Sequence, residues 1–416
     1  MIACLTKSCD INAVFKGYKD LDDVIIVGAG PAGNSAALHL AQRGYIVKVI
    51  ETKDRIGDKL CTGIVGVECI EKYPPNKTHI IRKSDTATFI SPSNIEVDLT
   101  KDSTQAYILD RISYISSIAD QAQAAGATYI KQTVTNVEVH PDFVEIQITD
   151  GHQITTLTAK AVIISGGFRT KFTRLLGLGE VKDVATGIQV EMTTRDQERV
   201  QVYFGRHIAP DFFGWLVPTH PNRSLVGLLV RRNAGSYLRS FITKLQTENK
   251  VISMNGRPAR WGVALQPLPR TFRDRVLVVG DAAGQTKPTT GGGIYYAFLA
   301  GEIAARALHK AFSLKDLSAS QLSYYEKEWK ALLERDIGIG RGARSLFQNL
   351  KDNQIDSLMK TIARNGIRSD ILNNEDFSFD WHGGTIVRAL GHPLLSGALR
   401  YVNPLATRIA ARIVTN

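Results

Sequence analysis

The chain has 416 residues, of which 44% are hydrophobic and 22% charged, and its formal net charge is +11. This length exceeds what one compact core accommodates, so we expect two or three domains. The four cysteines form no CxxC pair and no regular framework, which argues against a disulfide-rich secreted protein. No apolar run reaches the about 20 residues of a membrane span, and the N-terminal stretch lacks a signal-peptide core. We therefore expect a cytoplasmic protein that is not integral to a membrane.

Positive charge is concentrated in two stretches. Residues 219–273 contain ten Lys or Arg against the single acid Glu248, and residues 383–416 contain four Arg and no acid. Such stretches suit an anionic partner, either a phosphorylated substrate or a membrane surface; solvated surface is the alternative. Nothing resembles a zinc finger, an RNP motif or a helix-turn-helix, so we expect no nucleic acid. The second stretch is either an interfacial segment, giving peripheral contact at the inner membrane face, or a packed helical pair.

A glycine-rich turn lies between the first two predicted strands. Residues 22–27 (DDVIIV) predict a buried strand, and GAGPAG at 28–33 runs directly into a predicted helix. Residues 45–51 (YIVKVIE) predict the next strand, which ends at Glu51, where a carboxylate accepts the hydroxyls of an adenosine ribose. This order and spacing indicate a β–α–β unit that binds an adenine dinucleotide.

The residues of this turn have separate expected roles. Gly28 permits the tight turn, Gly30 lets the backbone approach a pyrophosphate, and Gly33 lets the helix pack on the strand. The helix that begins at Pro31 and Ala32 offers unpaired N–H groups and the positive end of its dipole. The turn therefore predicts a phosphate-binding site.

The middle of the chain combines one long helix with antiparallel strands. The helix is predicted over 108–127, and a β-meander follows over 133–167 with turns at Pro141-Asp142 and Asp150-Gly151. Shorter elements are expected as strands at 86–99, 186–192, 199–205 and 224–230 and as a helix near 237–247. No repeat or low-complexity linker separates these elements, so the strands form an insertion into the nucleotide-binding domain.

From about residue 318 the chain is predicted to be mostly helical. We therefore predict an α/β fold, α+β overall, in which a Rossmann-like domain is interrupted by an antiparallel-sheet substrate domain and followed by a helical region. The predicted parts are a cofactor-binding domain (22–75, 105–183 and 270–318), a β-sheet substrate-binding domain (76–104 and 184–269), a helical C-terminal region (319–416) and an N-terminal extension (1–21).

A second glycine-rich stretch, GDAAGQTKPTTGGGIYYAFLAG at 280–301, follows the predicted strand RVLVVG. It favours FAD over NAD, because the ribityl chain of a flavin needs an acceptor and its N1–C2=O edge becomes negative on reduction. Asp281 suits the ribityl chain, and backbone N–H groups at the start of the next helix stabilise the negative edge. The predicted flavin contacts in this stretch are Gly280, Asp281, Pro288, Gly291, Gly292, Gly293 and Ile294.

Four segments resemble the geranylgeranyl reductase family, within the larger hydroxylase-like FAD superfamily. The most specific is GDAAG…TGGGIYYA, preceded by LQPLPRTFRDRVLVV; the others are KLCTGIVG (59–66), YILDR (107–111) and FGWLVP (213–218). The resemblance covers about residues 22–310. It implies FAD as cofactor, Cys61 near the isoalloxazine, and a prenyl cavity. It also implies that Arg111, at the opening of a helix, contacts the cofactor or orients its ring. The chain departs from the family pattern at two places: Phe213 replaces Tyr, and Gly227-Leu228-Leu229 replaces Gly-x-Gly. These departures leave the identity of the substrate undetermined, but they do not affect the prediction of FAD binding.

The resemblance implies reduction of isolated alkenes in a geranylgeranyl or prenyl chain of a lipid or diphosphate-type substrate. Such an alkene is electron-rich, so hydride from reduced flavin N5 must be accompanied by a proton from a separate donor. Aromatic faces would stabilise the developing positive charge. The predicted catalytic residues are Cys61, Trp215 and Tyr295, and the predicted substrate contacts are Phe213, Trp215, Pro218, Tyr295 and Tyr296.

Several alternatives stay open. The alternative for Cys61 is that it is a small buried hydrophobic residue, and the alternative for Arg111 is that it caps a helix or forms a salt bridge. Lys287 is expected either near the anionic edge of the flavin or exposed in a loop. A flavin monooxygenase or halogenase acting on a small aromatic or apolar substrate is the second hypothesis, and a flavin-binding electron carrier the third. No metal cluster is apparent, and the electron donor, NADPH or a ferredoxin, is undetermined.

Overall fold

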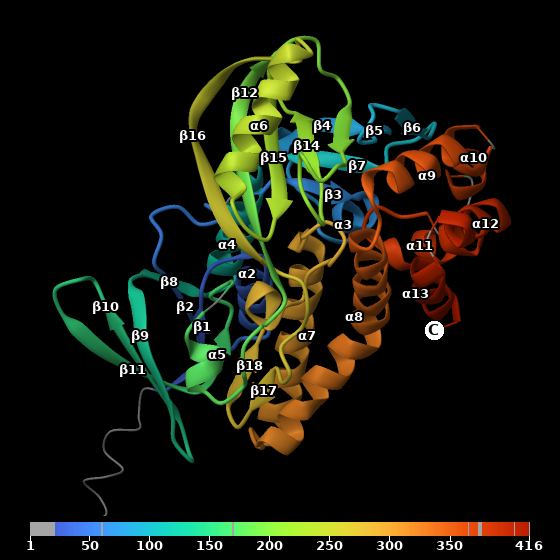
Figure 1. The fold of residues 1–416 in the computed structure, drawn as a ribbon. Coiled ribbons are helices and arrows are strands. Elements are labelled where there is room, and N and C mark those ends of the chain that lie inside the picture. Colours follow the sequence, from blue (N-terminus) through green and yellow to red (C-terminus); the bar gives the residue numbers. More distant parts are fainter. Residues whose placement is uncertain are drawn as a thin grey trace, which may run out of the picture.

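The computed structural model describes residues 21–59, 61–168, 170–364, 366–372, 377–402 and 404–415 (Figure 1). The N-terminal extension expected over 1–21 lies outside these residues except for residue 21. The described chain forms an eight-stranded and a seven-stranded sheet, a small three-stranded sheet, and helices that cover them. The predicted α/β fold class is confirmed.

The eight-stranded sheet holds the first glycine-rich turn. Its parallel centre runs β18-β11-β1-β2-β8, and β17 and the β9–β10 pair are antiparallel additions. Its strands are β1 (Asp22–Val27), β2 (Val47–Glu51), β8 (Thr128–Lys131), β9 (Thr133–Val139), β10 (Val144–Thr149), β11 (Ile154–Ile164), β17 (Phe272–Arg273) and β18 (Val276–Val278). The central strands are continuous apolar runs because both faces of a parallel sheet are covered.

Three helices pack beside this sheet: α2 (Pro31–Ala41), α4 (Arg111–Ala124) and α7 (Ile294–Ser313) (Figure 1). Asp110 caps α4, since its side chain accepts from Ser113 N. A Cβ at Gly301 would overlap the carbonyl of Ala32, so glycine allows α7 to lie directly on α2. This contact brings the first glycine-rich turn beside the helix that follows the second.

The seven-stranded sheet follows the order β16-β12-β15-β14-β13-β5-β6. Its strands are β5 (Thr86–Ile90), β6 (Glu96–Thr100), β12 (Val184–Thr194), β13 (Val200–Tyr203), β14 (Gly214–Pro218), β15 (Arg223–Val230) and β16 (Val251–Ala264), and α6 (Ala234–Thr247) packs on it. Strand β16 was not predicted. It is an edge strand whose middle is exposed and whose pairing with β12 is interrupted by irregularities, so its sequence lacks regular alternation.

A three-stranded sheet joins the two large ones, in the order β3-β7-β4. Its strands are β3 (Ile64–Gly66), β4 (Ile80–Ser84) and β7 (Ala106–Leu109). The short helices near it and near the large sheet are α3 (Val67–Lys72), α5 (Phe172–Leu175) and the single turns η1 (Lys77–His79) and η2 (Gly280–Ala283). This small sheet places Cys61, which precedes β3, between the two large sheets.

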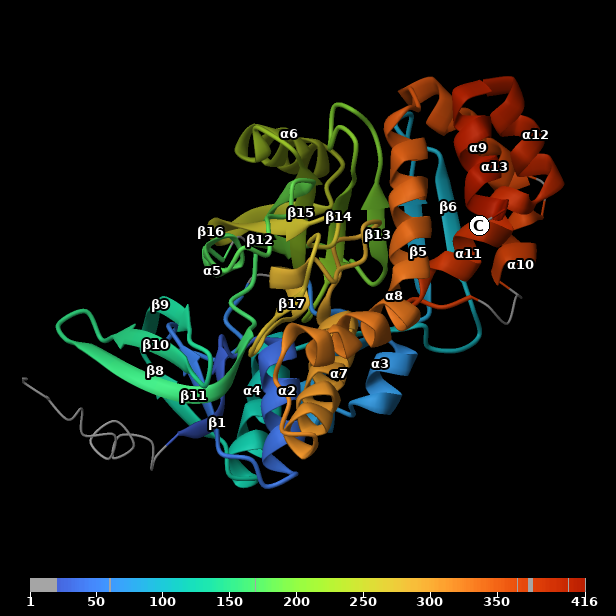
Figure 2. The ribbon, with the colours of Figure 1, turned by 90° about the horizontal axis from the view of Figure 1, so that it is seen from below.

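The C-terminal region begins with the long helix α8 (Ala319–Gln348), which runs from the eight-stranded sheet to the seven-stranded one (Figure 2). Next come α9 (Asp352–Arg364), α10 (Ile367–Leu372), α11 (His382–Gly391), α12 (Pro393–Val402) and α13 (Pro404–Thr415). Helices α9 and α10 contact β6. Among the described residues, no helix is both long and apolar enough to cross a membrane.

Helix α8 is tied to the second glycine-rich stretch by buried side chains. The hydroxyl of Tyr325 donates to Val278 O (2.8 Å) and accepts from Gln285 Nε2 (2.9 Å). In turn Gln285 Oε1 accepts from Gly280 N (2.7 Å). Both side chains are fully buried, so this chain of hydrogen bonds fixes the end of β18 against α8.

Candidate cofactor and active site

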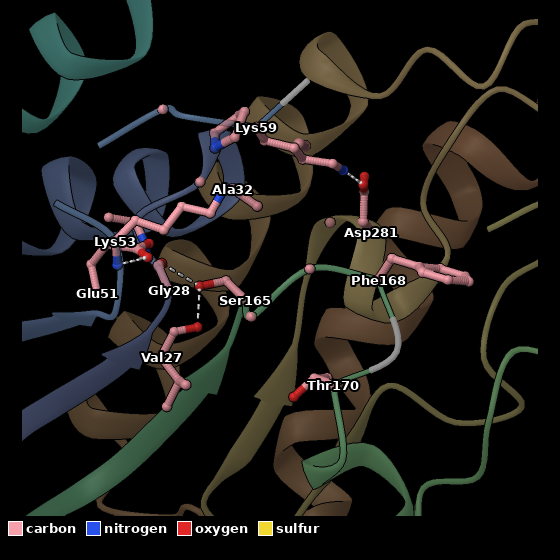
Figure 3. Close-up of a pocket in the computed structure, with 18 of the residues that line it drawn as sticks. Val27, Gly28, Ala32, Glu51, Lys53, Lys59, Ser165, Phe168, Thr170 and Asp281 are labelled. Atoms are coloured by element: carbon pink, nitrogen blue, oxygen red, sulfur yellow. Dashed lines mark hydrogen bonds and ion pairs between the residues drawn. The ribbon is translucent and has the colours of Figure 1, made fainter. Parts of the chain in front are cut away.

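A pocket of about 460 Å³ opens at the carboxyl ends of β1, β2, β11 and β18 (Figure 3). This is where ligands bind in open α/β sheets. It brings together most of the cofactor contacts predicted from the sequence. The predicted residues that line it are Gly28, Gly30, Pro31, Ala32, Glu51, Cys61, Arg111, Gly280, Asp281, Gly291, Gly293 and Ile294.

The first glycine-rich turn forms one wall of the pocket. Gly28 has φ +104°, and a Cβ there would lie 2.7 Å from Ser165 O. The Ser165 hydroxyl lies within hydrogen-bonding distance of Val27 O (2.8 Å) and Gly28 O (2.7 Å) and shares its one proton between these carbonyls, which fixes the turn. A Cβ at Gly33 would overlap the Gly28 carbonyl, so Gly33 lies between helix and strand and does not line the pocket.

Glu51 lies at the rim, at the end of β2. Its Oε2 accepts from Ala29 N (2.8 Å) and its Oε1 from Lys53 N (2.9 Å). These bonds orient the carboxylate without using all its acceptor positions. The predicted acceptor for ribose hydroxyls is thus held beside the phosphate-binding turn.

Arg111 supports the loop that carries Lys59. It is buried, it donates to the carbonyls of Gly57 and Lys59 (2.7 Å for Lys59 O), and it also lines the pocket. Across the pocket, Lys59 Nζ pairs with Asp281, as Figure 3 shows. Asp281 therefore faces the pocket as predicted, but it has a lysine partner that the sequence did not reveal.

The second glycine-rich stretch delivers the start of α7 to the pocket. Gly291 has φ +72°, and a Cβ there would lie 2.9 Å from Val263 Cγ1. Gly293 precedes the first residue of α7, Ile294, and both line the pocket. Two other predicted contacts, Pro288 and Gly292, are not among the lining residues that the structure describes.

Cys61 also lines the pocket and is half-buried. Gly63 N donates to its Sγ (3.5 Å), and Gln189 Nε2 donates to its carbonyl (3.5 Å). The other end of the Gln189 amide accepts from Trp215 Nε1 (3.1 Å). Trp215 is thus linked to the pocket through Gln189 and is not among its described lining residues.

The other predicted aromatic residues also lie behind the described lining. Phe213 contacts Trp215 at a ring distance of 5.9 Å. Tyr295 packs edge-on against Tyr73 and Trp381, and burial raises its pKa. Among the other predicted substrate contacts, Pro218 is buried at the end of β14, and Tyr296 donates its hydroxyl to Asp336.

Some lining residues were not predicted. Trp261, Phe168, Ser165 and Lys59 all contribute to the pocket. Trp261 is an aromatic residue on β16, a strand without sequence alternation, so no local pattern identified it. Lys287, expected either at the flavin edge or exposed, is instead buried and does not line the pocket.

The residues present fit FAD. A Cβ added at Gly30 would meet no described atom within 4 Å, so the backbone at the start of α2 is open to a phosphate. Neither α2 nor α7 carries an acid in its first turn, so both helix N-termini are free to face negative charge. The GAGPAG turn and Glu51 would hold the adenosine diphosphate half, and Asp281 and the turn before Ile294 the flavin half.

Comparisons with known proteins identify relatives of this chain. Residues 22–203 match the pyridine nucleotide-disulphide oxidoreductase family. The digeranylgeranylglycerophospholipid reductase of Methanosarcina acetivorans is 30% identical over 367 residues, which cover 83% of this chain and 89% of that protein. Digeranylgeranylglycerophospholipid reductase 2 of Methanococcoides burtonii is 31% identical over 360 residues, covering 82% and 87%.

Solved structures share the fold. A geranylgeranyl bacteriochlorophyll reductase-like protein from Thermoplasma acidophilum has a TM-score of 0.80 at 23% identity, over 95% of this chain and 99% of that one. A p-nitrophenol 4-monooxygenase from Pseudomonas putida has a TM-score of 0.68 at 14% identity, over 85% and 97%. Because this protein aligns with reductases at 30% and 31% identity over most of their length, it belongs to the geranylgeranyl reductase family and is an FAD-dependent oxidoreductase.

Proposed function

We propose that this protein saturates isolated C=C bonds in a geranylgeranyl or other prenyl chain carried by a lipid or diphosphate-type head group. One observation carries the proposal: Cys61 and the turn before α7 line the same pocket, and aromatic rings of the seven-stranded sheet adjoin it, with Trp261 in the lining and Trp215 packed against Trp261. Relatives that cover most of the chain are named for reducing such lipids. An alkene reductase needs these parts close together: a hydride source, a proton donor and an apolar surface for the chain.

Bound FAD, once reduced, would supply the hydride. The protein must supply the proton, because attack on an electron-rich alkene without protonation would build an unfavourable carbanion. Cys61 Sγ is the proposed donor, since it lines the pocket and its backbone is fixed by Gln189. Phe213, Trp215 and Trp261 are proposed to stabilise the developing positive charge.

The start of α7 has a separate role in this proposal. Its first N–H groups, at Ile294 and the residues after it, are not used inside the helix. They would stabilise negative charge on the ring edge that faces them. Gly291 and Gly293 are proposed to allow the backbone to come close to that edge.

The proposal assigns the two large sheets different tasks. The eight-stranded sheet and its helices would bind FAD, and the seven-stranded sheet would cover the prenyl chain. The proposed domains keep the limits expected from the sequence: 22–75, 105–183 and 270–318 for FAD, 76–104 and 184–269 for substrate, and 319–416 as a helical region.

We also propose peripheral contact with an anionic membrane surface. Helices α11, α12 and α13 carry arginines and no acid beyond residue 383, and Leu394 and Val414 are 49% and 41% exposed. Co-sedimentation with phosphatidylcholine vesicles, with and without phosphatidylglycerol, tests this. Binding only to the anionic vesicles, weakened by salt, is expected; equal recovery in the supernatant with both would reject it.

The test of the reaction is anaerobic. The purified flavoprotein is reduced with dithionite, geranylgeranyl diphosphate or a geranylgeranylated lipid is added, and flavin absorbance and product mass are followed together. We expect flavin reoxidation with a mass gain of two hydrogens per reduced bond. A flavin that stays reduced until oxygen enters, with no mass gain, would reject prenyl reduction and favour the monooxygenase alternative.

A further inference from the structure

A partly buried segment of the C-terminal region, residues 378–383, packs against residues that adjoin the cofactor pocket. It follows the undescribed residues 373–376 and ends in the first turn of α11. Its side chains contact three parts of the site: the turn after Cys61, the loop at 280–293 and the start of α7. Each of these contacts spans at least 85 residues of sequence.

Asp380 reaches the turn after Cys61. It is 1% exposed, and its carboxylate accepts from Gly66 N (3.0 Å) and Cys69 N (2.9 Å), at the start of α3. A Cβ at Gly66 would overlap this carboxylate. Gly66 therefore provides the room that lets Asp380 hold the strand β3, which begins three residues after Cys61.

Lys287 reaches the segment from the second glycine-rich stretch. It is 5% exposed, and its Nζ donates to Phe379 O (2.8 Å) and lies 3.7 Å from Asp380 Oδ1. The ammonium also lies over the rings of Tyr296 (5.8 Å) and Phe379 (5.3 Å). The loop that ends at the start of α7 is thus bound to the segment by a buried charge.

Two further residues complete the contact. The Trp381 ring lies 5.6 Å from Tyr295 and 5.4 Å from Tyr296, in the first turn of α7. His382 Nδ1 shares a hydrogen bond with Thr289 Oγ1 (2.5 Å), beside Lys287. The segment therefore contacts residues that adjoin the lining near Cys61 and near Ile294, and it does not line the pocket itself.

Neither the Lys287 ammonium nor the Asp380 carboxylate is stable in this buried position without the other. Burial raises the pKa of Asp380, while Lys287 and the two backbone N–H groups oppose that shift. Burial also lowers the pKa of Lys287. Removing one partner of a buried pair leaves an uncompensated charge, whereas removing both is much less disruptive.

We propose that Lys287 and Asp380 are a positioning pair for the cofactor site. Together they hold the loop at 280–293 and the strand after Cys61 at the spacing that FAD requires. The C-terminal region is then part of the cofactor site, although residues 378–383 do not line the described pocket. This inference concerns FAD binding and does not depend on which substrate is reduced.

The test measures FAD affinity and the melting temperature of the flavin-free protein in K287M, D380N, the double variant and G66A. G66A keeps both charges but adds the Cβ that collides with Asp380. We expect K287M and G66A to weaken FAD binding at least tenfold. The double variant should bind FAD at least threefold more tightly than K287M, because no unpaired charge remains.

A second readout is independent of FAD. In a Cys4→Ser, Cys9→Ser background, the alkylation rate of Cys61 in the flavin-free protein reports the position of the loop before β3, because Cys69 is fully buried and does not compete. We expect at least a threefold change in this rate for G66A. If the contact between Gly66 and Asp380 only stabilised the fold, G66A would not alter the alkylation rate of Cys61.

The matched control is Arg344, which is 8% exposed and pairs with Asp183 away from the pocket. R344M should lower the melting temperature but leave FAD affinity and the Cys61 rate within twofold of the wild type. The same result in K287M and G66A would overturn the proposal. If K287M does not fold, G66A decides by the same criteria.

Discussion

The Trp261 indole lies across Gly187, the residue directly opposite it on the neighbouring strand β12. A Cβ at Gly187 would come 2.5 Å from Trp261 Cε2, and the nearest atoms all belong to that ring. Gly187→Ala should therefore displace one side chain of the pocket wall and no backbone. We expect a raised KM for the prenyl substrate, at least fivefold, and a change in flavin fluorescence, with unfolding destabilised by less than about 1.5 kcal/mol.

Gly227→Ala is the informative contrast, because Gly227 lies under Trp215. A Cβ there would meet both the Trp215 ring and the carbonyl of Ile188, each at 2.5 Å. The backbone of the sheet must then move, so we expect a loss of about 2–3 kcal/mol in denaturant unfolding. Equal stability of the two variants would contradict this reading of the contacts.

Replacing Glu51 by Ala should weaken FAD binding about 10- to 100-fold, since a charged hydrogen-bond acceptor is worth about 1.5–3 kcal/mol. Fluorescence titration of the flavin-free protein with FAD measures this. The matched control is Asp54 in the following loop, whose side chain is 82% exposed. Asp54→Asn should bind FAD as the wild type does; a comparable loss there would point to the charge of the whole loop instead.

Cys61→Ala tests the proposed proton donor. We expect the single-turnover rate of flavin reoxidation by a prenyl substrate to fall about 100-fold or more, with FAD affinity unchanged within twofold. Cys69→Ala is the control, because Cys69 is fully buried and burial raises its pKa, so it is inert at neutral pH. An unchanged rate in Cys61→Ala would assign the proton to another group.

His382 predicts a pH dependence of stability. Burial, and then the neighbouring Lys287 charge, lower its pKa to about 3, so it stays neutral in the folded protein. The unfolded chain takes up the proton below about pH 6.5, and folding stability is therefore lost as the pH falls from 6.5 towards 3. Between pH 8 and pH 5 this histidine should cost about 2 kcal/mol.

Urea unfolding of wild type and His382→Gln at both pH values isolates the effect from that of the carboxylates. The variant should lose about 2 kcal/mol less than the wild type over this interval. Parallel losses in the two proteins would show that His382 gains its proton without disturbing the fold.

The pocket wall formed by the first glycine-rich turn could be predicted from local sequence patterns. The β1 strand, the GAGPAG turn and α2 follow one another directly in the chain. The sequence spacing of Gly28, Gly30 and Glu51 therefore determines how close they lie in the structure. The same holds for the turn before Ile294. The helix predicted over 108–127 instead begins at Arg111, because residues 106–109 form β7 and Asp110 caps α4.

The remaining parts depend on contacts between distant segments. Lys287 lies in a glycine-rich loop, where an exposed lysine was a reasonable expectation; its burial depends on Asp380, 93 residues later. Trp261 lines the pocket because Gly187 on another strand leaves room for its ring. No pattern along the chain contains either relationship, because each joins segments that are distant in sequence and meet only in the folded protein.

The hydrogen bonds from Gly280 through Gln285 to Tyr325 bear on the order of events during synthesis. Gly280 and Gln285 leave the ribosome before Tyr325 does, and Asp380 follows later still. A nascent chain released or stalled before α8 emerges has the GAGPAG turn but lacks the partners that shape the second wall. We therefore expect stable FAD loading to require α8 and residues 378–383, so that products truncated before α8 accumulate without flavin.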